Sequence, residues 1–423
     1  MRARGLGLAM IPWRDGIGMP FALAALTMRA TALRPLRRRS MQIPMRRLIL
    51  GTAGTILLAG LAATARDRFG SPVRSERATF RVTTLATGLD HPWGAAFLPD
   101  GRLLVTERPG RMRVVGRDGR VSLPLGGVPE VVTGDQAGLL DIALAPDFAV
   151  TRELYFCHSA LATGGVLTRL TRAVLSPDAT ALEGATPILD VTPAQERGRG
   201  HFGCRIAFGP RDGKLYLSTG ERQLERGRAQ RLGDLAGKVL RLERDGSPAA
   251  GNPFLGRPGA RPEIYSYGHR NPQGLAFNPW TGSLWEAEFG PRGGDEVNII
   301  RAGANYGWPV ATHGIDYDGS VISDLRSAPG MEDPVKVWTP AISPSGIAFY
   351  AGEAFPGWRG SLFLATLNAP GLVRLATEGD QVMSEERLLW NMVRMRHVVP
   401  GPDGSLYILT DEARGRILRL DPV

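Results

Sequence analysis

The chain has 423 residues, of which 43% are hydrophobic and 22% charged, and Gly (54) and Pro (32) together make up about a fifth of it. So many turn-forming residues favour an all-β protein over one built from long helices. The net charge of +10 would suit a nucleic-acid partner, but ten arginines and one aspartate lie in residues 1–65 and leave about +1 for the rest. We therefore expect no nucleic-acid partner.

A secretory signal is predicted near the N-terminus. Two arginines precede an apolar run over residues 48–63, and the sequence Ala-Thr-Ala at residues 63–65 fits a signal-peptidase site. The run is also nearly long enough to span a bilayer, so an uncleaved membrane anchor stays open. We expect residues 1–65 to be an extension with a signal peptide or anchor and residues 66–78 to be a linker. The protein is then periplasmic or secreted.

One pattern recurs six times between residues 80 and 423: a short apolar strand, a turn of Pro, Asp or Gly, and a second strand with alternating apolar residues. The copies lie at residues 91–107, 138–159, 203–221, 271–288, 344–367 and 396–412. Their spacing of roughly 45 to 70 residues suits four-stranded antiparallel blades around a channel. We predict an all-β, six-bladed β-propeller over residues 79–423, because a β-sandwich followed by a second domain would not explain six copies.

The ring is expected to close by pairing strands from both ends of the domain. Residues 79–85 are a candidate strand to join the last blade, which ends at residues 416–420. Such closure protects edge strands that would otherwise seek partners.

Cys157 and Cys204 are the two cysteines of the chain. An exported protein could pair them, but two cysteines are too few to indicate a disulfide framework. Free cysteine behaves as a small buried apolar residue. We expect two separate buried thiols.

The first candidate site residue is His201, in the glycine-rich turn GRGHFG before an inner strand. This position is the rim of the channel in a propeller. A neutral imidazole there can accept a proton, as a general base must. A loop histidine bonded to a carbonyl would have the same local sequence.

The second candidate is the pair Arg270 and Asn271, which precedes a strand in YGHRNPQG. Both side chains should project from the same rim. A guanidinium beside an amide suits an oxyanion or carboxylate ligand. A salt bridge with a loop cap would use the same two residues.

The third candidate is the glycine-rich loop over residues 288–309, which carries Asp295 and Glu296. Calcium takes six to eight oxygens from carboxylates and backbone carbonyls, so this composition suits a calcium site. The spacing is not that of an EF-hand. A solvated acidic turn is the alternative.

The fourth candidate is the pair Arg394 and Arg396 in the segment RMR. Residues at i and i+2 of an extended segment point to the same side, so the two cations can meet a polyanionic ligand. Exposed arginines are also common without a ligand.

The four stretches occur together and in the order of a known family. The motifs GHFGCRIAFGP, YSYGHRNPQGLAFNPWTG, EFGPRGGDEVNII, NYGWP and GPDGSLYILTDE resemble those of the soluble aldose sugar dehydrogenases and soluble quinoprotein glucose dehydrogenases. The similarity covers residues 80–423. It implies an enzyme that oxidises an aldose at C1 to the lactone with pyrroloquinoline quinone (PQQ) and calcium, and that passes electrons to an external acceptor.

The resemblance implies roles for residues near the sugar. His201 would take the proton of the C1 hydroxyl as hydride moves to the quinone. Gln136 would contact the sugar, and Glu221 is placed with it among the substrate-contacting residues. Arg270 would polarise the quinone oxygens as charge develops on them.

The resemblance also implies a cofactor site and two calcium sites. Asn271, Arg394 and Arg396 would hold the cofactor and its carboxylates, and Trp338 would shape the pocket. The carbonyls of Gly290 and Pro291 would bind the calcium that contacts the quinone. A second calcium would use the residues Glu296, Tyr306 (through its carbonyl) and Asp316.

Three departures from the family pattern stand out. Asn368 lies where the family generally has a lysine that contacts the cofactor. This cofactor-binding position therefore offers no positive charge to the three carboxylates of PQQ. Glu221 lies where the soluble glucose dehydrogenases have an aspartate, and Gly200 replaces an acid just before His201. We therefore expect the imidazole to lack an obvious orienting partner.

Three other functions compete with this one. A nicotinamide enzyme is disfavoured because no G-x-G-x-x-G opens a helix after a strand. A calcium-dependent lactonase would hold its metal by carboxylates in the channel and would need no arginine pair. A non-catalytic sugar or protein binder would keep the fold without the cofactor.

Overall fold

The computed structural model describes residues 70–423. The predicted signal peptide or anchor and the first residues of the predicted linker lie outside this range. Within residues 70–423, no helix is both long and apolar enough to cross a bilayer. Helical structure there is limited to α1 (Phe148–Thr151) and two short 3-10 turns, Arg226–Gln230 and Pro356–Trp358. The all-β prediction is confirmed.

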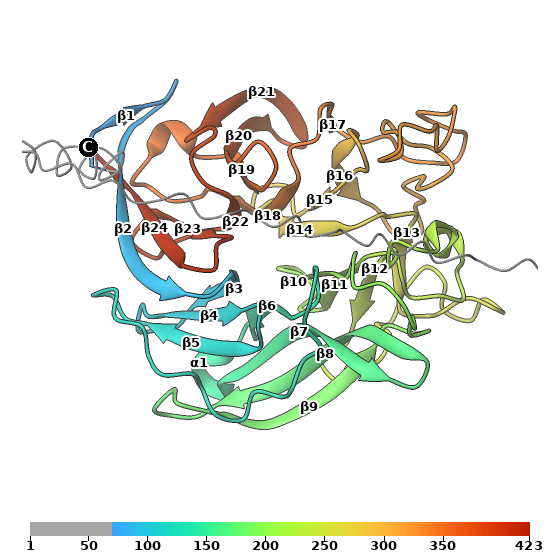
Figure 1. Cartoon of the computed structure of the whole chain (residues 1–423), viewed down its shortest axis with the longest axis horizontal. Helices are drawn as coiled ribbons and strands as arrows, with labels where there is room; N and C mark the ends of the chain where they lie inside the picture. Colours follow the sequence, from blue (N-terminus) through green and yellow to red (C-terminus); the bar gives the residue numbers. More distant parts are fainter. Residues whose placement is uncertain (1–69) are drawn as a thin grey trace, which may run out of the picture. The chain divides into compact units, whose positions relative to one another are not determined.

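The strands form six antiparallel sheets arranged in a ring (Figure 1). The first three sheets, in chain order, hold β3 (Pro92–Phe97), β4 (Leu103–Glu107) and β5 (Arg111–Val115); then β6 (Leu139–Leu144), β7 (Glu153–Ala162), β8 (Gly165–Leu175) and β9 (Leu182–Asp190); then β10 (Gly203–Phe208), β11 (Leu215–Thr219), β12 (Lys238–Leu242) and β13 (Ile264–Tyr267).

The other three sheets hold β14 (Pro272–Phe277), β15 (Leu284–Glu288), β16 (Asp295–Ile300) and β17 (Lys336–Trp338); then β18 (Pro344–Phe349), β19 (Leu362–Thr366), β20 (Gly371–Glu378) and β21 (Gln381–Leu388); and last β22 (Met395–Pro400), β23 (Leu406–Thr410), β24 (Gly415–Pro422), β2 (Thr79–Leu89) and β1 (Val73–Arg74). This is the predicted six-bladed propeller. Four blades have four strands, the first has three, and the closing blade has five.

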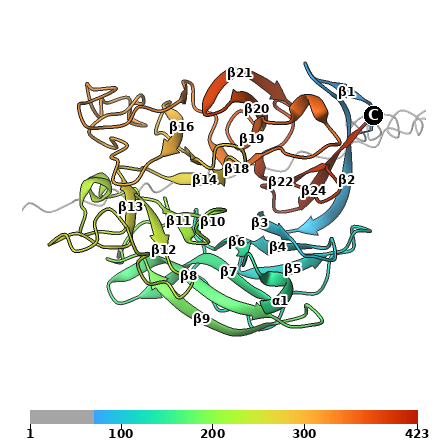
Figure 2. The same ribbon diagram turned by 180° about the vertical axis from the view of Figure 1, so that it is seen from behind.

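Both ends of the domain meet in the closing blade, as predicted. Strand β2 pairs antiparallel with β24, so that Val82 lies opposite Leu420, and the two strands run side by side in both views (Figures 1 and 2). Strand β1 adds to the outer side of β2. The predicted linker therefore belongs to the blade from Val73 onward.

Each blade presents its first strand to the channel, and the innermost strands β3, β6, β10, β14, β18 and β22 contact one another in turn. All six have a register shift near their start, for example between Gly203 and Ile206 in β10 and between Pro272 and Gly274 in β14. Such bulges bend a strand and redirect its side chains. At this end of the channel, side chains therefore need not alternate between the two faces of the blade, as they do where the blades pack.

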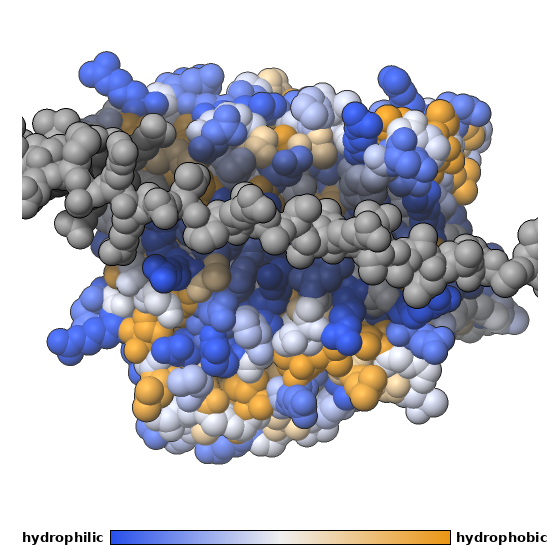
Figure 3. Space-filling view, in the orientation of Figure 1, coloured by the Kyte–Doolittle hydropathy of each residue, from blue (hydrophilic) through white to orange (hydrophobic). Residues whose placement is uncertain are grey.

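Hydrophobic packing between neighbouring blades holds the ring together. Strands such as β19 and β23 are buried along their whole length. Trp285 of β15 meets Phe349 of the next blade edge to face, with ring centroids 5.5 Å apart. On the face shown in Figure 3, side chains around the middle of the ring are mostly hydrophilic, and hydrophobic ones gather towards the lower edge. The apolar residues of the repeat thus build the blades, and the polar ones collect near the channel.

Cys157 of β7 and Cys204 of β10 form a disulfide. The expectation of two separate thiols was wrong, because the ring brings strands of the second and third blades together although the cysteines lie 47 residues apart in sequence. The bond fixes the start of β10, three residues after His201.

Candidate active site

A cavity of about 310 Å³ lies at the end of the channel where the inner strands begin. Trp93, Gln136, Gln273, Ser343, Arg394 and Arg396, each at or near the start of an inner strand, are among its lining residues. Its size suits a small organic ligand. A larger hollow of about 630 Å³, lined by residues such as Phe277 and Leu284, lies at the opposite ends of these strands and contains no histidine. We place the site in the smaller cavity for its converging polar groups.

His201 lies next to this cavity, just before β10. It has a positive φ of 48°, and its backbone N–H donates to Oε1 of Gln136 at 3.0 Å. Its Nδ1 lies 3.0 Å from Oε2 of Glu221, and both side chains are buried. A carboxylate only accepts hydrogen bonds, so it holds the proton on Nδ1 and leaves Nε2 with a free lone pair. The expectation that the imidazole lacks an orienting partner was therefore wrong.

Burial and the neighbouring charges together set the charge states of this pair. It lowers the pKa of His201 below its ordinary value, although the Glu221 carboxylate acts in the opposite direction. Burial tends to raise the pKa of Glu221, but His201 and Arg270 bring it below its ordinary value. A neutral imidazole beside a carboxylate is therefore the form expected near neutral pH, and it is the form that a general base needs.

Asn271 joins His201 to the neighbouring blade. Its Oδ1 accepts the backbone N–H of Gly203 at 3.1 Å, and its Nδ2 donates to Oε1 of Gln136 at 3.3 Å. The amide oxygen of Gln136 thus receives hydrogen bonds from both His201 and Asn271. Glu221 is fully buried behind the imidazole, so the structure gives it an orienting position where we expected contact with substrate.

Arg270 is buried between the cavity and the loop at residues 288–309. Its Nη1 donates to the carbonyls of Phe289 (2.9 Å) and Gly290 (2.7 Å), and its Nη2 donates to the Tyr317 hydroxyl at 3.3 Å. The guanidinium also lies over the ring of Trp308, 5.2 Å from its centroid. These contacts fix the planar group rigidly beside the cavity.

Arg394 and Arg396 share one carboxylate. Nη2 of Arg394 and Nη2 of Arg396 donate to Oδ2 of Asp411 at 3.0 and 2.9 Å, and Nη1 of Arg396 donates to Gln273 at 2.7 Å. Arg396 is buried, whereas half of the Arg394 side chain is exposed. Two guanidinium groups against one carboxylate leave a net positive charge in the cavity wall.

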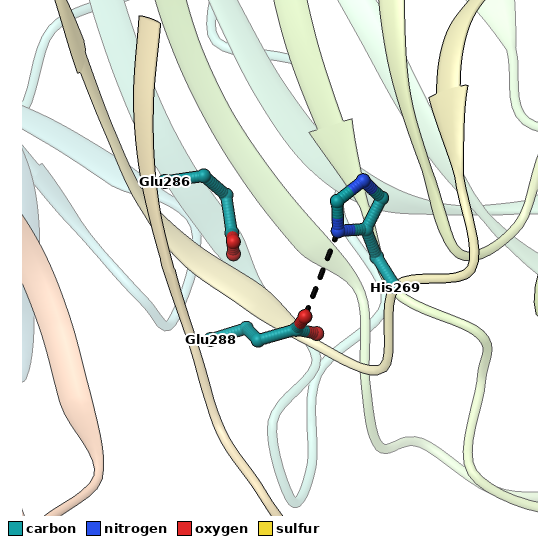
Figure 4. A group of neighbouring side chains, drawn as sticks. All are labelled: His269, Glu286 and Glu288. Atoms are coloured by element: carbon teal, nitrogen blue, oxygen red, sulfur yellow. Dashed lines mark ion pairs between the residues drawn. The ribbon is translucent and has the colours of Figure 1, made fainter. Parts of the chain in front are cut away.

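A second cluster of charge lies beside the cavity and is called the acidic pocket: His269, Glu286, Glu288, Glu296 and Asn298. Figure 4 shows the side chains of His269, Glu286 and Glu288 pointing toward one another, and their ligand atoms lie within 4.8 Å of each other. One amide group, Nδ2 of Asn298, faces all three carboxylates at 3.2 to 3.5 Å. Burial and the nearby Glu288 raise the pKa values of Glu286 and Glu296 well above the ordinary value.

A small space of about 10 Å³, the size of one ion or water, adjoins the acidic pocket. Glu288, Gly290, Glu296 and Tyr306 line it, as does Phe289, which also lines the larger cavity. Within residues 70–423, Oε1 of Glu286 and Oδ1 of Asn298 are buried without a hydrogen-bond partner. Oxygen-rich and short of donors, this group suits a hard cation such as calcium.

The predicted calcium ligands are brought together in part. Glu296, Tyr306 and Gly290 meet at the small space. Asp316 does not line it, and its carboxylate pairs with Arg226 at 2.5 Å. Pro291 does not line it either. Asp295, the other acid of the loop, accepts backbone N–H groups of Gly290, Ile342 and Ser343, so it shapes the loop instead of offering a free ligand.

Two predicted cofactor residues lie away from the cavity. Trp338 is buried among the apolar residues of two blades, and its Nε1 donates to Glu385 at 3.0 Å. Asn368 is exposed, and its Nδ2 donates to the Ala341 carbonyl at 2.9 Å. The adjacent residue Leu367 lines the cavity, whereas Trp338 and Asn368 do not, and their contact with the cofactor stays a prediction.

The comparisons with known proteins bear on this geometry. A family model described as Glucose / Sorbosone dehydrogenase matches residues 89–419. The chain belongs to the glucose/sorbosone dehydrogenase family. Aldose sugar dehydrogenase YliI of Escherichia coli K12 is 42% identical over 352 residues, which cover 82% of this chain and 94% of that protein. The family resemblance inferred from the motifs is confirmed.

Solved structures of this family share the fold. One, described as glucose dehydrogenase, has 46% identity and a TM-score of 0.78 and covers 80% of this chain and 98% of its own. The PQQ-bound form of aldose sugar dehydrogenase from Streptomyces coelicolor has 34% identity and a TM-score of 0.67, over 83% of this chain and 99% of its own.

Several site residues of this family member were missed by the sequence analysis. Trp93 lines the cavity and has the Arg205 guanidinium 4.0 Å above its ring. Tyr317 lines the cavity from a loop, and Glu286 and Glu288 form the acidic pocket from within a strand. The strand sequence LWEAE carried a signal, because Glu286 and Glu288 alternate with apolar residues and so share one face of a buried strand.

Proposed function

We propose that this sugar dehydrogenase oxidises an aldose at C1 to the lactone, with PQQ as hydride acceptor and His201 as general base. The observation that carries the proposal is the buried His201–Glu221 pair, which leaves Nε2 free beside an arginine-lined cavity. Family membership supports the reaction class, and the PQQ-bound relative supports the cofactor.

The chain's own groups would act on the sugar as follows. Nε2 of His201 accepts the C1 hydroxyl proton, while Glu221 keeps the other ring nitrogen protonated and fixes the ring plane. The side chain of Gln136, held beside His201 and Asn271, lies where it can bind a sugar hydroxyl. The bound quinone supplies the electron sink for the hydride.

The cavity fits a planar tricarboxylate. Its volume of about 310 Å³ matches a small cofactor, and Trp93 and Phe289 offer aromatic faces. Arg394 and Arg396 would bind carboxylates, because guanidinium groups donate paired hydrogen bonds to them. Arg270 donates to the carbonyl of Phe289, a residue of the cavity wall, and would stabilise negative charge on the quinone oxygens.

We also propose that calcium binds beside the cofactor. The carbonyls of Gly290 and Pro291 would hold one ion next to the quinone. Glu296 and the carbonyl of Tyr306 would hold a second, together with Glu288 and Glu286, which the sequence analysis did not include. The buried oxygens without donors support this assignment.

Export is a further part of the proposal. The arginine-flanked apolar run before residue 65 is typical of a signal peptide. The disulfide supports an oxidising compartment, where such bonds form and persist. Intact-mass analysis of protein expressed with its own N-terminus should give a chain starting near Arg66; retention of residues 1–65 would contradict cleavage and favour an anchor.

A dye-linked assay against a panel of aldoses tests the function. Chelated protein should turn over sugar only after both PQQ and calcium are added, with an external dye as electron acceptor. Turnover that is independent of PQQ would contradict the proposal. Lactone hydrolysis without PQQ would instead support the calcium-dependent lactonase, and PQQ binding without any turnover would support a binder.

A further inference from the structure

Arg108 is a third cation of the cavity that neither the motifs nor the comparisons assign. It lies in the turn between β4 and β5 of the first blade, and it lines the cavity together with Arg394 and Arg396 of the last blade. The basic residues therefore approach the ligand space from two blades.

The backbone of Arg108 is fixed to two inner strands. Its N–H donates to the carbonyl of His91, just before β3, at 3.1 Å, and its carbonyl accepts the N–H of Leu139, the first residue of β6, at 3.0 Å. Gly138 packs so closely that a Cβ there would lie 2.1 Å from the Arg108 carbonyl oxygen and 2.5 Å from its Cγ. The side chain thus starts from a rigid position at the end of the channel.

The guanidinium of Arg108 has no protein partner within residues 70–423. The two other arginines that line the cavity have acceptors: Arg394 and Arg396 both donate to Asp411, and Arg394 also donates to a backbone carbonyl. The ion pairs of the described chain include none with Arg108, although the side chain is only partly exposed. Its N–H donors are therefore available to a ligand in the cavity that the residue lines.

The charge of Arg108 nonetheless acts on the opposite wall. Burial tends to raise the pKa of Asp411, but Arg396, Arg394 and Arg108 together hold it well below its ordinary value. Asp135, on the rim, is the one carboxylate in the cavity lining itself. The three arginines of the lining thus outnumber the nearby carboxylates of Asp135 and Asp411, and the remaining positive charge favours an anionic ligand.

We propose that Arg108 binds a carboxylate of the cofactor directly and completes a three-arginine anion site with Arg394 and Arg396. This inference rests on the proposed function, since it takes PQQ as the ligand. A fixed backbone limits the ordering that the contact requires, and the guanidinium has no ion pair within the described part of the protein to break before it binds the ligand. Binding should therefore depend on Arg108 although it lies in a different blade from the predicted RMR segment.

The test is a PQQ titration in the presence of calcium and without sugar, followed by protein fluorescence. Arg108→Ala should raise the Kd at least about tenfold, as expected for loss of a charged hydrogen bond. Arg108→Lys should recover part of the loss, because it restores the charge without the planar fork. Arg120→Ala is the matched control: it removes one positive charge from the same blade, at an exposed turn after β5, and should leave the Kd unchanged.

The outcomes separate this inference from the proposed function. If the wild-type chain does not bind PQQ, the proposed function itself fails. If the wild-type chain binds PQQ and Arg108→Ala binds it equally well, only the role of Arg108 is overturned. An Arg108→Ala variant with an unchanged PQQ Kd, but a KM raised for a uronic acid and not for glucose, would assign the carboxylate to the substrate and also overturn the inference.

Discussion

Phe289 lines both the arginine-lined cavity and the small space beside the acidic pocket, and these two neighbouring regions are rich in residues of opposite charge. In the cavity, Arg394 and Arg396 share the single carboxylate of Asp411, and the wall keeps a net positive charge. In the acidic pocket, three glutamates face one amide, and burial raises the pKa values of Glu286 and Glu296.

The difference shows that neither region is satisfied by the protein alone. Burying like charges is costly unless a partner of opposite sign compensates them. An anion would compensate the charge of the cavity, and a cation would compensate that of the acidic pocket. Because the two regions are neighbours, these two ligands would lie close together. The proposed pair of ligands, a quinone with carboxylates and a calcium ion, would meet both requirements.

The largest expected effect comes from a residue that belongs to neither charged region. His201→Ala should lower kcat by about 10²- to 10⁴-fold, because the general base is lost, while PQQ and calcium still bind. Steady-state kinetics and a PQQ titration on the same preparation measure both quantities. Loss of PQQ binding along with activity would make His201 a structural residue.

The pH profile refines the same prediction. The base works when neutral and burial lowers its pKa, so the acid limb of kcat/KM should lie below pH 6.5, the ordinary value. Glu221→Gln removes a carboxylate that favours the protonated ring, so this limb should move to still lower pH while kcat falls. If the acid limb of Glu221→Gln lies at the same pH as that of the wild type, Glu221 does not control the protonation of His201.

Removing an arginine from the cavity wall should weaken PQQ binding without changing calcium binding. Arg394→Ala should raise the PQQ Kd roughly tenfold or more, because a charged hydrogen bond to a carboxylate is lost. Arg396 is buried and also donates to Gln273, so its replacement would break a buried ion pair and a buried hydrogen bond, and Arg394→Ala is the cleaner variant. Equal affinity in both proteins would place the cofactor elsewhere.

Removing a carboxylate from the acidic pocket should weaken calcium binding. Calcium at a hundred times its Kd stabilises the folded state by about 2.7 kcal/mol, which raises Tm by several degrees. Glu296→Gln should reduce that rise. The apo variant should lose little stability, since burial and the neighbouring carboxylates already disfavour a charge at Glu296. A Tm of chelated wild-type protein that does not move on adding calcium would refute the cation site.

The smallest effect is expected at the edge of the basic cavity. Asn368→Lys adds a charge where the family generally has one, but the side chain is exposed and does not line the cavity. The PQQ Kd should therefore fall only a few-fold, through a screened interaction. A fall as large as the rise caused by Arg394→Ala would mean that residue 368 contacts the ligand.

The sequence was enough to predict the fold because each blade repeats one local pattern. The six copies and the closure by residues 79–85 need only periodicity and turn residues. His201, Arg270 and Glu296 could be selected as polar residues that no blade requires. Contacts between blades were beyond such reasoning: the pairing of Glu221 with His201, the disulfide, and the unpaired Arg108 all depend on how separate copies meet in the ring.

Anaerobic absorption spectroscopy of the protein loaded with PQQ and calcium tests the central claim most directly. Adding an aldose without any electron acceptor should convert the spectrum of the bound quinone to that of its reduced form within one turnover. His201→Ala, carrying the same amount of PQQ, should do so at least about a hundredfold more slowly. A quinone spectrum that no aldose changes, in protein that binds both PQQ and calcium, would contradict the account.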